Sequence, residues 1–315
     1  PGKGIFLRCS NFTKIENNIV SDSAWGILLH CSNNTKIADN TIIDSTDMDG
    51  VYLFQSIGNL VEDNNIARNR DGIFLCESGN NTIVGNQIVN NRYWGMEVWG
   101  LEANYNQIVS NNISNNGFAH MAGLDGIYVD LSCGNEIINN TIGSNARDGI
   151  LLSRSSYNKI RSNDVFNNTR RAGILLSSSS MNNSIVENWL AGNGYAIYLD
   201  GSNVNSIYHN DFVNNARQVW CRSGSEINAW DNGYPSGGNF WSDYNGTDFY
   251  NGPCQNVTGS DGVSDIPYVI DVNNRDNYPL MKPYPWATHD VGITSVTTSK
   301  TIVGQGYNVS ISIMT

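Results

Sequence analysis

The stretch Gly26-Ile27-Leu28-Leu29, followed by Ile37-Ala38-Asp39-Asn40-Thr41-Ile42, contains the pattern on which most of the chain is built. Its first part recurs at Gly4, Gly26, Gly50, Gly72, Gly95, Gly126, Gly149 and Gly173, and once with alanine, at Ala196. The interval is 22–24 residues, except for the 31 residues between Gly95 and Gly126. A repeat of this length without a helical pattern predicts a β-solenoid with one coil per repeat.

The second part of the repeat, Ile-x-x-Asn-x-Ile, places one asparagine in each coil. Successive side chains of a strand point to opposite faces, so each coil is expected to direct about four apolar side chains inward, each contributing roughly 1.5–3 kcal/mol of burial. The asparagines are predicted to hydrogen-bond from coil to coil, at ~0.5–1.5 kcal/mol each, and the glycines to adopt a positive φ. The asparagines are Asn40, Asn64, Asn86, Asn111, Asn140, Asn163, Asn188 and Asn210.

Over about residues 1–220, this pattern resembles the right-handed parallel β-helix superfamily, in particular NosD-like proteins and the related carbohydrate-binding and sugar hydrolase repeat. The resemblance implies an all-β fold with about nine to ten coils. The two motifs are specific for that fold and not for an activity, because one fold hosts many functions.

Residues 221–288 lose the repeat and become rich in aromatic residues, glycine and aspartate, as in Asn239-Phe240-Trp241-Ser242-Asp243-Tyr244. This segment resembles the one that closes many NosD-like β-helices, and the end of a β-helix is an open sheet edge that needs a cover. Residues 289–315 contain two alternating strand patterns, from Asp290 and from Val309, and look like the start of an immunoglobulin-like adhesion domain.

The C-terminal cap has an alternative use as a structural Ca²⁺ site, and Ca²⁺ is the cofactor that the sequence suggests. Oxygen ligands are what Ca²⁺ requires, although the spacing here matches no EF-hand loop. Capping is the preferred interpretation. The candidate ligands are Asp261, Asp265, Asp271, Asn273 and Asp276.

The charge and hydropathy of the chain exclude several classes of function. The net charge is −11 and the pI about 4.7, which argues against nucleic acid as a partner and weakens the case for an acidic polysaccharide as a tight ligand. No run of 18 apolar residues occurs, so no membrane span is expected. Because the chain begins in mid-repeat at Pro1 and stops at Thr315 in what looks like mid-strand, we interpret it as a piece of a longer protein. Its open first coil could pair with another copy, giving end-to-end self-assembly.

Ten Asn-x-Ser/Thr sequons indicate a glycoprotein, although a chain rich in asparagine, serine and threonine also forms sequons by chance. The acceptors are Asn11, Asn33, Asn80, Asn112, Asn139, Asn167, Asn182, Asn245, Asn256 and Asn308.

Six cysteines occur without the spacing of a zinc site. Cys9 and Cys31 each lie five residues after the glycine of their coil, so they should stack within disulfide range. The other two pairings, both weaker, are Cys221 with Cys254 in the cap and, by elimination, Cys76 with Cys133. Such a set of disulfides would indicate an oxidising, extracellular compartment.

The candidate ligand site lies at the long fifth coil, whose extra residues are expected within 115–124. Aromatic rings beside a carboxylate and a histidine are typical of a sugar-binding cleft, and a surface loop over exposed aromatics is the alternative. The residues are Tyr93, Trp94, Glu97, Trp99 and His120.

Asp125 and Arg147 are further catalytic candidates, because a lyase or epimerase on this fold would need carboxylates and a base near the sugar. Asp125 belongs to a set with Asp49, Asp71 and Asp148, each directly before a repeat glycine, and turn chemistry is the preferred interpretation of that set. The four histidines are scattered, so a copper role by analogy with NosD has little support in the residues.

Two functions follow as hypotheses. The first is an extracellular or cell-surface β-helix that serves as a structural, adhesive or glycan-binding scaffold, with glycans or other copies of itself as partners. The second is a polysaccharide lyase, epimerase or hydrolase that uses a groove near the fifth coil.

Overall fold

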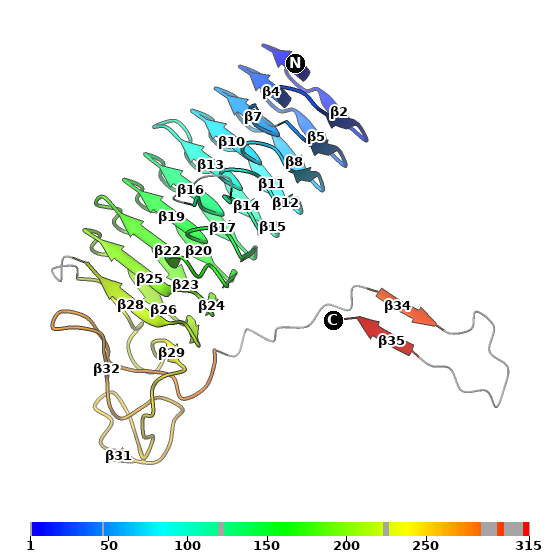
Figure 1. The fold of residues 1–315 in the computed structure, drawn as a ribbon. Coiled ribbons are helices and arrows are strands. Elements are labelled where there is room, and N and C mark those ends of the chain that lie inside the picture. The colour runs from blue at the N-terminus through cyan, green and yellow to red at the C-terminus, as the bar shows by residue number, and fades with distance from the viewer. Residues whose placement is uncertain are drawn as a thin grey trace, which may run out of the picture. The chain divides into compact units, whose positions relative to one another are not determined.

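The computed structural model describes residues 2–45, 47–118, 123–222 and 227–284, and the backbone of two strands at 295–298 and 311–314. The chain divides into two units, Pro1–Tyr284 and Pro285–Thr315. The first unit is the predicted parallel β-helix of about nine coils, whose strands stack into three parallel sheets (Figure 1). No described residue belongs to a helix long and apolar enough to cross a membrane.

Each coil contributes one strand to each of the three sheets, which we name A, B and C in the order in which the chain visits them. Sheet A consists of β1 (Lys3–Arg8), β4 (Trp25–His30), β7 (Val51–Phe54), β10 (Ile73–Cys76), β13 (Met96–Trp99), β16 (Ile127–Asp130), β19 (Ile150–Ser153), β22 (Ala172–Ser177), β25 (Tyr195–Asp200) and β28 (Arg217–Cys221). Sheet B consists of β2 (Lys14–Glu16), β5 (Lys36–Ala38), β8 (Leu60–Glu62), β11 (Thr82–Val84), β14 (Gln107–Val109), β17 (Glu136–Ile138), β20 (Lys159–Arg161), β23 (Ser184–Val186) and β26 (Ser206–Tyr208). Sheet C consists of β3 (Ile19–Ser21), β6 (Thr41–Ile43), β9 (Asn65–Ala67), β12 (Gln87–Val89), β15 (Asn112–Ser114), β18 (Thr141–Gly143), β21 (Asp164–Phe166), β24 (Trp189–Ala191), β27 (Asp211–Val213) and β29 (Phe240–Trp241).

The core has the composition that the repeat predicts. In the coil that starts at Gly72, Ile73 and Leu75 of β10, Ile83 of β11 and Ile88 of β12 are all fully buried. They belong to one continuous apolar cluster that runs through the coils. Four inward side chains per coil are thereby confirmed, and their burial is the main stabilising contribution.

Asparagines stack at all three corners of the coil, and not at one corner only. In each stack the amide Nδ2 of one asparagine donates to the Oδ1 of the asparagine in the next coil, at 2.9–3.3 Å. The predicted coil-to-coil ladder between sheets B and C is confirmed and runs from Asn18 to Asn239. The other two run from Asn59 to Asn228 between sheets A and B, and from Asn69 to Asn215 between sheets C and A.

The predicted reason for the repeat glycines was wrong. None of the eight has a positive φ; the left-handed residues are mostly those directly before a ladder asparagine, such as Asp63 and Ser110. The glycines are required by space, because a Cβ on Gly72 would lie 2.4 Å from the Gly95 carbonyl oxygen and 2.4 Å from Ile88 Cγ2. The close approach of the next coil therefore excludes any side chain at this position.

The additional residues of the fifth coil are divided between two corners, which corrects the single insertion expected within 115–124. From Met96 to Gln107 the chain uses 11 residues, against 9 from Ile73 to Thr82 in the preceding coil. From Asn112 to Ile127 it uses 15, against 9 from Gln87 to Met96. Two extra residues thus lie between sheets A and B, and six between sheets C and A.

The segment after β28 covers the C-terminal end of the core. Phe212 and Trp241 stack with ring centroids 4.1 Å apart, and Trp241 stacks in turn on Tyr268 at 4.1 Å. Trp230 is also fully buried in the core cluster. Two short antiparallel pairs complete the cap: β30 (Tyr250–Asn251) with β31 (Val257–Thr258), and β32 (Tyr268–Val269) with β33 (Arg275–Asp276).

The second unit is described only as an antiparallel pair, β34 (Ser295–Thr298) with β35 (Ile311–Met314). The immunoglobulin-like domain from His289 onward stays a prediction, since most of residues 285–315 lie outside the described part. Self-assembly through the first coil also stays a prediction.

The predicted disulfides are absent: all six cysteines lie in described residues and are thiols in the structure. Side chains that stack from coil to coil point in the same direction, and their Cβ atoms are separated by the strand spacing of ~4.8 Å. The two Cβ atoms of a disulfide lie closer, about 3.8 Å apart. Cys31 Sγ accordingly faces Gln55 Oε1 in the next coil, at 3.7 Å.

The other two predicted pairs fail for different reasons. Cys76 is in register with Trp99 of the next coil, and Trp99 with Asp130 of the coil after that. Cys133 follows Asp130 by three residues, so two coil spacings separate Cys76 from the strand next to Cys133, which is too far for a disulfide. Cys254 is exposed on a turn, while Cys221 lies beside the Asn274 amide.

Candidate functional site

The outer face of sheet A carries a column of large apolar side chains. They occupy the variable position of Gly-Ile-x-Leu and stack in register, one per strand. We call this set the aromatic column: Phe6, Leu28, Tyr52, Phe74, Tyr128, Leu151, Leu175, Tyr198 and Trp220, with Glu97 between Phe74 and Tyr128. The outer face of sheet B bears mainly charged and aliphatic residues, and that of sheet C mainly small and polar ones. The aromatic column therefore distinguishes sheet A.

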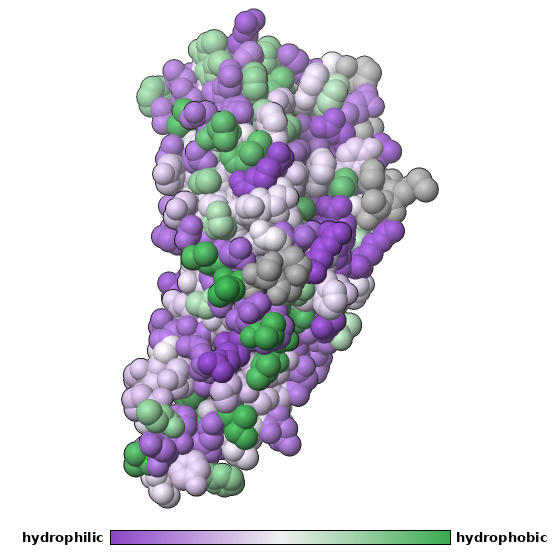
Figure 2. All heavy atoms as spheres, turned by 90° about the vertical axis from the view of Figure 1, so that its left-hand side faces the viewer, coloured by the Kyte–Doolittle hydropathy of each residue, from purple (hydrophilic) through white to green (hydrophobic). Residues whose placement is uncertain are grey.

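Rings of the aromatic column stack on each other and on neighbouring rings. Tyr52 and Phe74 lie parallel with centroids 5.0 Å apart, and Tyr128 stacks on Trp94 at 5.5 Å. Trp99, two residues after Glu97 on the same strand, keeps 38% of its surface exposed. Figure 2, viewed from the side on which sheet A lies in Figure 1, shows hydrophobic residues distributed among hydrophilic ones along the coils. The outer face of sheet A thus combines apolar rings with polar groups, a combination that aromatic residues supply at binding surfaces exposed to water.

Glu97 is the one carboxylic acid in the aromatic column. It is half-buried, and its carboxyl forms no hydrogen bond or ion pair with any described residue. Burial raises the pKa of Glu97 to about 8, with repulsion by Asp71 and Asp130 adding to the effect and Arg70 opposing it. At neutral pH the group is therefore largely a protonated carboxyl, which can donate a hydrogen bond.

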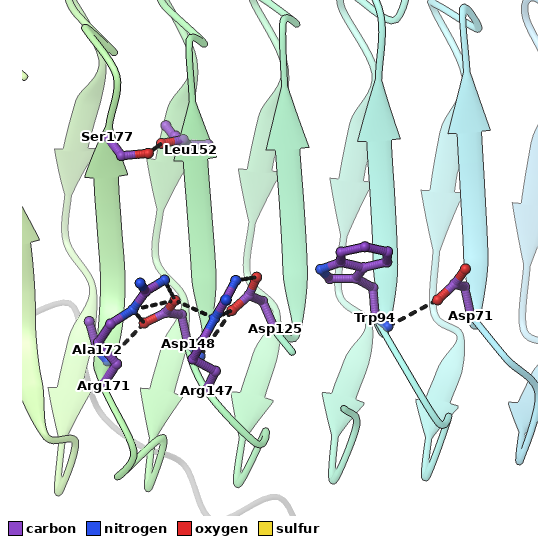
Figure 3. Close-up of polar contacts among 9 residues, drawn as sticks. All are labelled: Asp71, Trp94, Asp125, Arg147, Asp148, Leu152, Arg171, Ala172 and Ser177. Carbon is purple, nitrogen blue, oxygen red and sulfur yellow. Dashed lines mark hydrogen bonds and ion pairs between the residues drawn. The ribbon is translucent and has the colours of Figure 1, made fainter. Parts of the chain in front are cut away.

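Beside the column, aspartates form a ladder at the start of the sheet A strands (Figure 3). Each accepts a hydrogen bond from a backbone amide of the next coil. The Oδ1 atom of Asp71 receives Trp94 N at 3.1 Å, and that of Asp125 receives Asp148 N at 3.2 Å. Asp148 Oδ1 receives Ala172 N at 2.9 Å. These contacts hold successive coils in register.

Arginines neutralise this ladder. Arg147 binds Asp125 through two hydrogen bonds of 2.9 and 2.8 Å and also reaches Asp148, which Arg171 contacts from the other side (Figure 3). Asp125 is fully buried; its burial and the charge of Asp148 raise its pKa to about 7, against the opposing effect of Arg147.

A second group of the ladder lies next to Glu97. Arg70 contacts Asp49 at 2.8 Å and Asp71 at 3.1 Å. Burial, together with the charge of Asp71, raises the pKa of Asp49 to about 8. Arg154 binds Asp130, so Arg70 and Arg154 each already have a carboxylate partner.

The structure brings together some of the predicted site residues. Glu97 and Trp99 point outward from β13, and Trp94 lies just before that strand with its ring on Tyr128. Tyr93 is half-buried, and its backbone amide binds the Arg70 carbonyl. His120 lies outside the described residues. Asp125 and Arg147 belong to the ladder, bound to each other.

A cavity of about 400 Å³ lies near the fifth coil, at the corner between sheets C and A. Its lining contains none of Tyr93, Trp94 and Trp99, the aromatic residues that were predicted for a groove there. The one aromatic ring in the lining is that of Phe118, in the longer segment of the fifth coil. The lining residues are Asn90, Asn91, Arg92, Asn115 and Phe118.

Tyr52, Phe74, Tyr128 and Arg70 were missed from the sequence. The available signal was the variable position of the repeat: in Gly-Ile-x-Leu, x is aromatic or leucine in every coil but the fifth, where Gly95-Met96-Glu97-Val98 has glutamate.

The predicted Ca²⁺ ligands do not converge in the structure. Asp265 accepts the amides of Phe249 and Tyr250, while Asp276 is fully buried and accepts Asn239 N and Trp241 Nε1. Asp271 accepts the backbone amide of Asn273, and Asp261 accepts that of Val263, so each carboxylate stabilises a local turn. Each carboxylate has its own intrachain donors, and the residues that the structure describes include no group of three metal-ligating side chains.

The sequon asparagines lie at the surface. Of the nine that are described, seven are exposed and two, Asn33 and Asn112, are half-exposed; Asn308 lies outside the described residues. None of the nine belongs to a strand of sheet A. Any glycans attached to these nine would thus start outside the strands that carry the aromatic column.

Two solved structures share the fold. The A-module of the Azotobacter vinelandii mannuronan C-5 epimerase AlgE4 superposes with a TM-score of 0.61 at 18% identity, over 67% of this chain and 62% of that chain. A double mutant of the periplasmic alginate epimerase AlgG superposes with a TM-score of 0.57 at 19% identity, over 72% of this chain and 69% of that chain. At such identities the likeness concerns the fold alone.

Among curated proteins, a cell surface glycoprotein of Methanothermus fervidus is 30% identical over 183 residues. The match includes 55% of this chain and 29% of that protein. The chain thus spans less than a third of the length of this relative.

A family model described as periplasmic copper-binding protein (NosD) matches residues 2–123 and 103–246, which is more than half of the chain. The described residues do not fit a copper centre, because no three of their histidine, cysteine or carboxylate side chains converge. His209 Nε2 lies 2.8 Å from the Ser236 carbonyl oxygen, and His30 packs on Phe54. The match therefore rests on the repeat and its β-helix, and on that basis the chain belongs to the NosD family.

Proposed function

We propose that this protein is a cell-surface β-helix that binds a linear glycan along the aromatic column of sheet A. The observation that carries the proposal is the stacked, partly exposed set of rings on one face of the solenoid, at one side chain per coil. The apolar face of a sugar ring packs on aromatic rings, whose edges leave room for hydrogen bonds to the hydroxyl groups.

The dimensions of the column suit an extended chain of sugars. Successive strands of sheet A lie ~4.8 Å apart, which is the scale of one sugar unit. Leu28, Leu151 and Leu175 are buried, so the surface offered to a ligand is centred on the partly exposed stretch from Tyr52 through Phe74 and Glu97 to Tyr128. The absence of sequons from the described strands of sheet A supports a face kept open for a ligand.

The comparisons support the surface location. The relative from Methanothermus fervidus is named a cell surface glycoprotein, and the exposed sequons here suit a glycosylated surface protein.

Binding to a panel of linear oligosaccharides, measured by isothermal titration calorimetry, tests this function. We expect Tyr52→Ala combined with Trp99→Ala to weaken binding about tenfold or more, which corresponds to about 1.4 kcal/mol. Tyr157→Ala is the matched control, since Tyr157 is 65% exposed and lies outside sheet A. Unchanged affinity in the double variant, or the same loss in the control, would refute the aromatic column as the site.

Catalysis at the same face is the second candidate function, and Glu97 favours it. A carboxyl whose pKa is raised to about 8 can act as a general acid at neutral pH. A screen for cleavage or epimerisation of uronic-acid and neutral polysaccharides tests this candidate. Turnover that falls at least a hundredfold in Glu97→Gln would support it; no turnover, or turnover that survives this substitution, would exclude it.

A further inference from the structure

We infer that Glu97 determines the specificity of the aromatic column, by hydrogen-bonding a hydroxyl group of an uncharged sugar and disfavouring sugars that carry carboxylate or sulfate groups. This inference rests on the proposed glycan-binding function and assigns the ligand class of that site. It assigns no chemical step to Glu97.

The position of Glu97 shows that the fold does not require a carboxyl there. Its register neighbours are Phe74 on β10 and Tyr128 on β16, and the same position holds leucine in Leu151 and Leu175. An apolar side chain at this position is therefore compatible with the strand and its packing. A carboxyl that is half-buried among rings without a partner costs free energy, so the fold alone gives no reason to place one there.

The carboxyl of Glu97 is open to a ligand. It has no hydrogen-bond or ion-pair partner within the described ranges, and the two arginines nearby are engaged by Asp49, Asp71 and Asp130. Glu97 points outward from β13 on the same face as the exposed Trp99. A sugar that packs on these rings would bring its hydroxyl groups to the Glu97 carboxyl.

The electrostatics around Glu97 select against anionic sugars. Glu97, Asp49, Asp71 and Asp130 together share only two cations, those of Arg70 and Arg154. Because the pKa of Glu97 and that of Asp49 are both raised to about 8, the surroundings become net negative as these two groups ionise. An additional anion there is repelled, by about 1 kcal/mol per charge at 4 Å even in bulk water. A hydroxyl group avoids this repulsion and can accept a hydrogen bond from the protonated carboxyl.

The other ionisable groups that face Glu97 allow its titration to be isolated. Tyr52 and Tyr128 have pKa values raised by burial, that of Tyr128 to about 12, and burial also raises the pKa of the Cys76 thiol. Asp49 has a pKa raised to about 8, and Asp125, in the next coil, has one raised to about 7; Asp125 is also retained in all variants. Because Asp49 is retained in all variants, a pH effect that disappears with Glu97 belongs to Glu97.

The experiment compares the intact protein with Glu97→Gln and Glu97→Leu. Affinities for cellohexaose, mannohexaose and a mannuronate hexamer are measured by calorimetry at pH 6 and pH 9.5. The matched control is Glu102→Gln, an exposed glutamate in the same coil but outside sheet A. Thermal unfolding of each variant verifies the fold.

We expect the intact protein to bind a neutral hexasaccharide, and to bind it about tenfold more weakly at pH 9.5, where Glu97 is ionised. Glu97→Gln keeps the affinity at pH 6 and loses the pH dependence, since an amide is neutral and still donates. Glu97→Leu binds the neutral sugar about tenfold more weakly at pH 6 and, at pH 9.5, discriminates less against the mannuronate hexamer than the intact protein does.

Two outcomes would overturn the inference alone: Glu97→Leu with unchanged affinity and selectivity, or Glu97→Gln with the full pH dependence. In both, loss of binding in the Tyr52 and Trp99 double variant would leave the proposed function standing. If the intact protein binds none of the three oligosaccharides, or if the double variant keeps full affinity, the glycan site and its specificity are both overturned.

Discussion

Replacing Asn111 with alanine is expected to destabilise the solenoid by about 2–4 kcal/mol, because it removes one rung of the ladder between sheets B and C. Asn111 Oδ1 accepts from the amide nitrogen of Asn86 at 2.9 Å and from its side-chain Nδ2 at 3.0 Å. Asn111 Nδ2 donates to Ile83 O, Val109 O and Asn140 Oδ1. Alanine can replace none of these bonds, and the buried Asn86 amide would lose its acceptor.

The shift of the urea midpoint, followed by circular dichroism, measures this effect. Asn112→Ala is the matched control, since Asn112 is the next residue and is half-exposed, and its side chain donates to the exposed Gln87 side chain. The control should change stability by no more than about 0.5 kcal/mol. Both variants are made in a host that does not glycosylate, because Asn112 is a sequon acceptor. Equal losses in the two variants would contradict a specific role of the ladder.

Replacing Arg147 with methionine is expected to cost about 3–5 kcal/mol at pH 8, because it leaves Asp125 and Asp148 buried without their shared cation. Both aspartates are fully buried, and Arg147 contacts both. Methionine keeps most of the length of the side chain and removes the charge. The effect should greatly exceed that of Lys159→Met, which breaks an exposed ion pair with Glu136 worth at most about 1 kcal/mol.

The same variant has a predicted pH dependence. The pKa of Asp125 is raised in the folded protein to about 7, from 3.8, so the folded state binds the proton more tightly than the unfolded state. This contribution to stability is complete below pH 4 and is lost as the pH rises towards 7. Arg147 opposes the rise in pKa, so its removal extends the loss to higher pH.

The deficit of Arg147→Met relative to the intact protein should therefore be smaller at pH 5 than at pH 8. Urea is the denaturant of choice, because guanidinium salts screen the charges under study. A deficit that is larger at pH 5, or one below about 1 kcal/mol at pH 8, would show that Arg147 does not neutralise the ladder.

The candidate site could be predicted only in part, because its residues are close in space but far apart in sequence. Glu97, Trp94 and Trp99 are found from the sequence since they lie within one strand and the segment before it. Tyr52 and Phe74 stack across two strands, 22 residues apart. Their contact depends on the register of sheet A, which a pattern read along one coil does not contain.

The sequence by itself determined the length of the coil, the four inward positions and the asparagine ladder between sheets B and C. Each of these follows from a local rule, since alternate side chains of a strand face opposite sides and an identical residue at a fixed period stacks on itself. The sequence could not determine why glycine is required, because the clash comes from the carbonyl of a residue one coil later. Only the tertiary structure placed the aromatic column beside the ladder of aspartates and arginines. It also set the Glu97 carboxyl between two rings, with no hydrogen-bond or ion-pair partner among the residues that the structure describes. These contacts, and the burial that raises the pKa of Glu97, arise only when the coils stack.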